Sequence, residues 1–165
     1  MSDIRGDAHA RARRFAIVAS RFNDVVVRRL VDGASACLRA NGAAHGGATV
    51  VWVPGAFELP LVARTMASSG RYDAVVCLGA VIRGETAHFD HVATQAAEGI
   101  RRASEDTGVP VVFGVLTTDT LEQAVERAGG AHGNKGWEAA EAALEMADLL
   151  DRLPKEAGEM HGVLR

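Results

Sequence analysis

Two residues of the stretch GETAH, Thr86 and His88, are of types that can bind an anion and move a proton. The stretch follows an apolar run and precedes a helical pattern, so free backbone N–H groups and the positive end of a helix dipole should meet there. That arrangement favours an anion such as phosphate, and Thr86 adds a hydroxyl. The same dipole disfavours the imidazolium form of His88, which predicts a histidine that exchanges protons near neutral pH. The competing interpretation is a histidine that only caps the helix.

A second candidate region begins at Arg127 and continues through a glycine-rich run to residue 136. Arg127 could supply two donors to a phosphate, or it could only stabilise the end of a helix. Lys135 is one of two lysines in the chain and the sole candidate for a Schiff-base nucleophile outside the tail. Gly136 stands where a nucleotide-binding loop has Ser or Thr, so the run does not indicate a nucleotide site.

Metal chemistry is not expected from this sequence. Glu85, His88 and His91 have the spacing of part of a carboxylate–histidine site, but such sites need a second copy on another helix, which the sequence lacks. Cys37 and Cys77 lie within apolar runs far apart and are interpreted as reduced, buried side chains.

The elements that must position these residues alternate along the chain. Almost continuously apolar runs predict strands at residues 15–19, 48–53, 74–80 and 111–116. Helical patterns follow at 24–41 with Asp24 as cap, after Pro60, at 88–108, at 121–128 and at about 134–153. We expect the last helix to turn Ala140, Ala143, Met146 or Ala147, and Leu150 inward.

This order predicts an α/β fold, a three-layer α/β/α sandwich on a four-stranded parallel sheet with the flavodoxin-like strand order. Residues 14–153 form the single domain, 1–13 a polar arm outside the core, and 154–165 a tail. Ligands of open parallel sheets bind at the carboxyl ends of the strands. Three of the five phenylalanines, Phe22, Phe57 and Phe113, lie in or near those segments, and Phe22 is expected to offer an exposed ring to a planar ligand.

Composition excludes several classes of protein. The chain has 165 residues, 48% of them apolar, so it is not disordered. With 21 acidic and 18 basic residues it has no positive excess, and nucleic acid is not an expected partner. It shows neither a signal peptide nor a membrane span, so a cytoplasmic location is expected. The mean hydropathy of +0.04 predicts either that much apolar surface lies in one core or that some of it is buried against other copies.

Five motifs in chain order carry a resemblance to a known family: SRFN at 20–23, PGAFELP at 54–60, GAVIRGETAHFDHV at 79–92, FGVLT at 113–117 and RAGGAHGNKGWEAA at 127–140. Together they resemble the 6,7-dimethyl-8-ribityllumazine synthases of riboflavin biosynthesis. The resemblance implies an enzyme, a transferase without cofactor or metal. It would condense 5-amino-6-(D-ribitylamino)uracil with 3,4-dihydroxy-2-butanone 4-phosphate, releasing phosphate and water.

The resemblance also implies roles for individual residues. His88 would transfer protons, and Glu85, Thr86 and Arg127 would bind the butanone phosphate, Glu85 through its backbone N–H. The aminouracil would contact Phe22, Ala56, Phe57, Glu58, Ala80, Val81, Ile82 and Phe113.

The family implies a homo-oligomer built of pentamers, with Phe113 and Arg127 reaching the pocket of a neighbour and the N-terminal arm joining the neighbour's sheet. The short form of the segment between Arg127 and Lys135 goes with shells of sixty subunits, and riboflavin synthase is the candidate partner. Two alternatives remain open from the sequence: a non-catalytic flavin- or lumazine-binding protein, and a Schiff-base aldolase using Lys135.

Overall fold

A computed structural model describes residues 1–45 and 48–155 of the chain. Its main sheet consists of β1 (Phe15–Ser20), β2 (Ala48–Val53), β3 (Ala74–Ile82) and β4 (Val111–Thr118). The helices are α1 (Asp24–Ala40), the short η1 (Ala56–Glu58), α2 (Leu59–Ser68), α3 (His88–Thr107), α4 (Leu121–Glu126) and α5 (Lys135–Arg152). Between α4 and α5, β5 (Ala128–Gly130) and β6 (Gly133–Asn134) pair as a small antiparallel hairpin.

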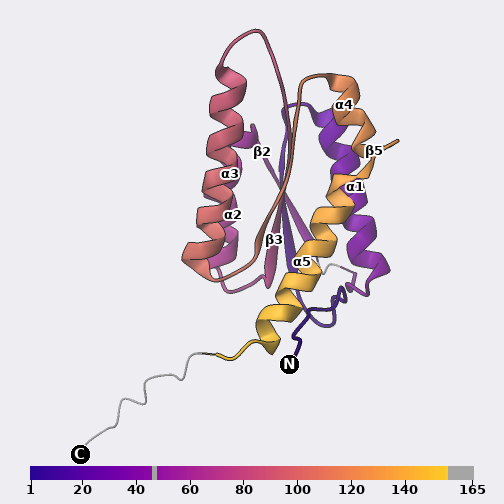
Figure 1. The fold of residues 1–165 in the computed structure, drawn as a ribbon, viewed down its shortest axis with the longest axis vertical. Helices are drawn as coiled ribbons and strands as arrows, with labels where there is room; N and C mark the ends of the chain where they lie inside the picture. The colour runs from indigo at the N-terminus through magenta and orange to yellow at the C-terminus, as the bar shows by residue number, and fades with distance from the viewer. Residues whose placement is uncertain (46–47, 156–165) are drawn as a thin grey trace, which may run out of the picture.

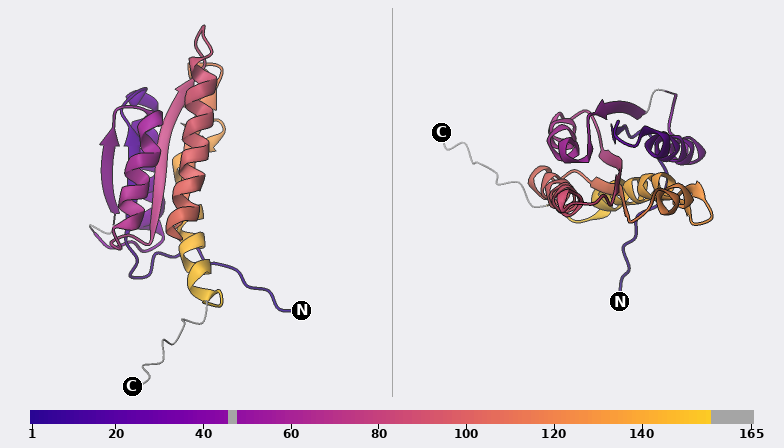
Figure 2. Two further views of the ribbon diagram at one scale, coloured as in Figure 1. Left: turned by 90° about the vertical axis from the view of Figure 1, so that its left-hand side faces the viewer. Right: turned by 90° about the horizontal axis from the view of Figure 1, so that it is seen from above.

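All four strands of the main sheet run parallel in the order β2-β1-β3-β4. Helices α2 and α3 cover one face of the sheet, and α1 and α5 cover the other (Figure 1). The view from above shows the same layers on either side of the strands (Figure 2). The expected α/β/α sandwich is therefore confirmed.

Each face of the sheet has its own hydrophobic core, which explains why the sequences of the central strands β1 and β3 are almost continuously apolar. In β1, Phe15, Ile17 and Ala19 pack toward α1 and α5, whereas Ala16 and Val18 pack toward α2 and α3. All five are fully buried. Complete burial of a side chain such as valine, isoleucine or phenylalanine contributes about 1.5–3 kcal/mol, so both alternating sets stabilise the sheet.

Small residues let α5 lie close to α1. A Cβ atom added at Gly136 would overlap the backbone carbonyl of Leu30 in α1. Further along α5, Ala140, Ala143 and Ala147 are buried. Of the two alternatives Met146 and Ala147, it is Ala147 that faces inward, and Met146 is 40% exposed. Leu150, also expected to face inward, is 37% exposed, because the alanine face makes the contact.

Part of the N-terminal segment, which was expected to be an arm outside the core, packs on the subunit. Ala10 is fully buried, and its N–H donates to the carbonyl of Asn41 at 2.8 Å. The carboxylate of Asp148 in α5, which is itself buried, accepts from the backbone N–H of Asp7 at 2.9 Å and from the guanidinium groups of Arg11 and Arg13. Residues 7–13 thus pack on their own subunit.

Two cysteines are buried and unpaired, as the sequence predicted. Burial, with a smaller contribution from Glu141, raises the pKa of the Cys37 thiol to about 11. Within the described residues, no helix combines the length and the apolar character needed to cross a membrane. Most of the expected tail, residues 156–165, lies outside the described residues.

Candidate active site

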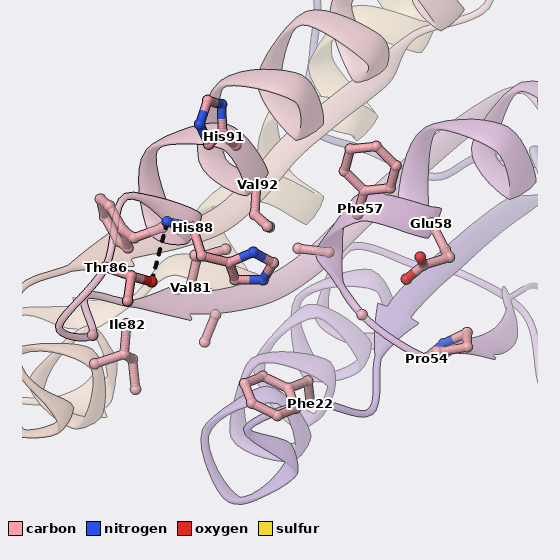
Figure 3. A pocket seen from close by; sticks show the side chains of 15 residues that line it. Phe22, Pro54, Phe57, Glu58, Val81, Ile82, Thr86, His88, His91 and Val92 are labelled. Carbon is pink, nitrogen blue, oxygen red and sulfur yellow. Dashed lines mark hydrogen bonds between the residues drawn. The ribbon is translucent and has the colours of Figure 1, made fainter.

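A cavity of about 770 Å³ opens at the carboxyl ends of β1, β2 and β3 (Figure 3). This is the edge at which ligands of parallel sheets bind. The structure brings together in this cavity nine residues that the sequence singled out: Phe22, Ala56, Phe57, Glu58, Ala80, Val81, Ile82, Thr86 and His88. Its remaining wall includes Pro54, Gly55, Phe89 and Val92, which the same strand-end rule could have selected.

The wall that follows β2 is a tight turn. Gly55 is extended, and its carbonyl accepts from the N–H of Glu58 at 3.3 Å, which closes η1. Ala56 is buried beneath the turn, while the ring of Phe57 is 59% exposed. In Figure 3, the Glu58 carboxylate points toward the open space of the cavity. The turn therefore presents one aromatic face and one negative acceptor.

The wall that follows β3 carries the residues suited to anion binding and proton transfer. The N–H of His88 donates to the Thr86 hydroxyl at 3.4 Å, a long bond at the start of α3. His88 and His91 both line the cavity. In Figure 3, the His88 imidazole points toward the middle of the cavity, whereas the ring of His91 lies further from it along α3. Both Thr86 and His88 are exposed, so a ligand in the cavity can reach them.

Arg83 fixes the loop that leads to His88. Its guanidinium donates to Asp119 at 2.8 Å and to Asp90 at 3.5 Å, and lies 4.3 Å from the centre of the Phe89 ring. Hydrogen bonding to Asp119 is the main cause that raises the pKa of Arg83. Because Asp119 follows β4 and Asp90 belongs to α3, these contacts tie the loop to both elements and limit its movement.

Phe113 and Arg127 lie elsewhere in the same chain. They line a second cavity of about 520 Å³ beside β4, together with His132, Lys135 and Glu138. Of the residues that the structure describes, none lines both cavities. Glu85 is exposed and lies outside both linings.

The two cationic side chains of this second cavity, Arg127 and Lys135, flank the β5–β6 hairpin. The N–H of Lys135 donates to the carbonyl of Arg127 at 2.8 Å, which keeps the two residues adjacent. Arg127 caps the end of α4, and its guanidinium donates to the Gln123 carbonyl of that helix at 3.0 Å. Lys135 pairs with Glu138 at 3.2 Å. Across residues 1–45 and 48–155, His, Cys, Asp and Glu side chains form no cluster of three suited to a metal ion.

Comparison with known proteins agrees with this geometry. The family described as 6,7-dimethyl-8-ribityllumazine synthase matches residues 12–151, most of the chain. A protein of Syntrophus aciditrophicus (strain SB) named 6,7-dimethyl-8-ribityllumazine synthase is 57% identical over 144 residues. That alignment covers 87% of this chain and 94% of the relative.

Proposed function

Because this chain belongs to the 6,7-dimethyl-8-ribityllumazine synthase family, we propose that its two cavities are complementary halves of one active site shared between subunits. The reaction is the condensation of 5-amino-6-(D-ribitylamino)uracil with 3,4-dihydroxy-2-butanone 4-phosphate. It releases phosphate and water in riboflavin biosynthesis. The separation of Phe113 and Arg127 from the residues around His88 carries the proposal.

The first cavity holds the aminouracil. The exposed ring of Phe22 stacks on the flat pyrimidine, a contact that aromatic rings make with any heterocycle of this kind. Backbone groups of Ala80, Val81 and Ile82 bind its edge. The segment Ala56, Phe57 and Glu58 holds the ribityl chain, with the Glu58 carboxylate accepting from hydroxyl groups.

The butanone phosphate lies between the two halves. Backbone N–H groups at the start of α3, including that of Glu85, and the Thr86 hydroxyl bind the phosphate from one subunit. Arg127 of the neighbour supplies charged donors, and Phe113 of the neighbour closes the space above the pyrimidine. The Glu85 side chain is negative, so its contribution to phosphate binding comes from the backbone alone.

The substrate amine attacks the ketone and forms an imine with loss of water, so no protein lysine is needed as a nucleophile. His88 moves protons during this addition, during the loss of phosphate and during ring closure. Holding two substrates in contact lowers the barrier further, because a bimolecular step becomes an intramolecular one.

The assembly that completes the site is a pentamer, and twelve pentamers form a shell of sixty subunits that can enclose riboflavin synthase. Apolar side chains on the edge strand β2 support a subunit contact: Val50 and Trp52 are 38% and 37% exposed. The short connection from Arg127 to Lys135 supports the proposal of a sixty-subunit shell. The enzyme is proposed to act in the cytoplasm.

Incubation of the purified protein with both substrates tests the proposal, with product followed by its lumazine fluorescence. Product should form only when both substrates are present. Binding of the lumazine without turnover would contradict the assignment as an enzyme. Sedimentation of the same sample measures the assembly independently.

A further inference from the structure

Asn23 has an unusual backbone next to the proposed pyrimidine site. It takes a left-handed conformation, with φ 60° and ψ 42°, at the N-cap position of α1. Among the described residues, Arg11 is the other non-glycine residue with positive φ. Such a conformation is costly for most residues, but asparagine, aspartate and glycine tolerate it. The backbone carbonyl of Asn23 accepts from the N–H groups of Val26 and Val27, so this conformation starts the helix immediately after Phe22.

The side chain of Asn23 contacts the sheet. N-cap asparagines usually accept from the first free N–H groups of their own helix. Here Nδ2 of Asn23 instead donates to the carbonyl of Ala80 at 2.8 Å. The last residue pair of the β1–β3 ladder is Ala19 with Leu78, and Ala80 lies two residues further along β3. The Asn23 amide therefore takes the place of a strand N–H and extends the link between these strands beyond the end of β1.

This link matters because little else positions Phe22. Its ring is 72% exposed in the subunit, so packing does not hold it in one place. Its backbone N–H donates to the carbonyl of Pro54 at 3.1 Å. Phe22 and Asn23 thus connect the β1 loop to Pro54 on one side and to Ala80 on the other, and both of these residues line the cavity.

We propose that Asn23 is a positioning residue that sets where the Phe22 ring lies over the pyrimidine. This inference rests on the proposed function, because it assumes that Phe22 stacks on the aminouracil. Without the bond to Ala80, the loop has several accessible arrangements, and the apparent affinity falls with the fraction that is competent to bind.

Two replacements of Asn23 separate the contribution of its backbone conformation from that of its side-chain hydrogen bond. Asn23→Gly permits the left-handed conformation without strain and removes the bond to Ala80. Asn23→Asp keeps size and conformation but places an acceptor against the Ala80 carbonyl. The matched control is Asn41→Gly at the other end of α1, where the asparagine amide donates to the Cys37 carbonyl at 2.9 Å, far along the helix from the cavity.

Steady-state kinetics with the two actual substrates should distinguish these variants. We expect Asn23→Gly to raise the KM for the aminouracil about three- to ten-fold, the equilibrium effect of one neutral hydrogen bond. Asn23→Asp should raise it further. The KM for the butanone phosphate and kcat should change less than about two-fold, since only binding of one substrate is altered. Asn41→Gly should leave both KM values at the parental level.

A double-mutant cycle with Phe22→Ala tests whether Asn23 acts through Phe22. In the Phe22→Ala background, Asn23→Gly should have no further effect on the KM for the aminouracil. An equal effect in both backgrounds would overturn the inference, as would an unchanged KM in Asn23→Gly when Phe22→Ala alone raises it. If Phe22→Ala itself leaves the KM unchanged, the proposed placement of the aminouracil is wrong, and the inference fails with it.

Discussion

Replacement of His88 by alanine tests the proposed proton-transfer step. A single positioned histidine typically contributes about 10² to 10⁴ to the rate of proton transfer. We therefore expect kcat of His88→Ala to fall by that factor, equivalent to a barrier increase of about 3–5 kcal/mol. The KM values should change by only a few-fold, because the imidazole points into the cavity without being assigned to either substrate's binding groups.

The fold should tolerate this replacement. His88 is exposed at the first turn of α3, and surface substitutions usually change the free energy of unfolding by less than about 0.5 kcal/mol. Thermal unfolding of the same preparation checks this point. His91→Ala is the comparison, because His91 lies one turn further along α3 and lines the same cavity, but its ring is further from the middle of the cavity than that of His88. Its loss in kcat should be far smaller. A parental kcat in His88→Ala would remove His88 from the mechanism.

Three further substitutions test other parts of the account. Arg127→Ala should raise the KM for the butanone phosphate about ten- to hundred-fold, the effect of lost charged hydrogen bonds, and a selective loss of aminouracil affinity would contradict the assignment. Gly136→Ala should lower the free energy of unfolding in denaturant titrations by about 3 kcal/mol or more, because its Cβ would overlap the Leu30 carbonyl; Gly84→Ala, with open space around it, is the control. Burial by itself would raise the pKa of Asp148, but hydrogen bonds from the Asp7 N–H, Arg13 and Arg11 outweigh it and lower the pKa to about 2. A lowered pKa stabilises the fold above the ordinary value of 3.8 and ceases to do so as the pH falls through about 2. Asp148→Asn should therefore unfold at lower denaturant concentration than the parent at neutral pH, and the difference between the two midpoints should narrow in acid. A difference that does not change with pH would refute the stabilising role of the Asp148 carboxylate.

The sheet and most helices could be predicted because their signals are local. Continuous apolar runs marked the four strands. β1 and β3 are covered on both faces as expected, whereas the edge strand β2 is largely exposed in the single subunit. Gly108 marked the end of α3 in a left-handed conformation. The cap of α1 was misplaced by one residue. Asp24 is a common capping type, but the chain uses Asn23, whose left-handed backbone and bond to Ala80 depend on a strand distant in sequence.

Contacts between distant segments account for the other differences. The burial of Ala10 depends on the end of α1 and on Asp148, more than a hundred residues away in the sequence. The three-residue strand β5 consists of alanine and glycine, which are typical of turns rather than strands. The strand-end rule placed Phe22, Glu58 and His88 together without any knowledge of contacts. It could not place Arg127 in the same cavity, because in a single subunit Arg127 lies in another one.

Mixed oligomers of two inactive variants give the most direct test of an active site shared between subunits. His88→Ala and Arg127→Ala disable opposite halves of the proposed site. When the butanone phosphate is kept below the parental KM, each homo-oligomer should therefore show about a tenth of the parental rate or less. When the two are co-expressed, random assembly pairs an intact His88 half with an intact Arg127 half at about one interface in four. Each of those interfaces carries a complete site, so the mixed assembly as a whole should recover about a quarter of the parental activity. A mixed assembly that stays as inactive as its parts would contradict it.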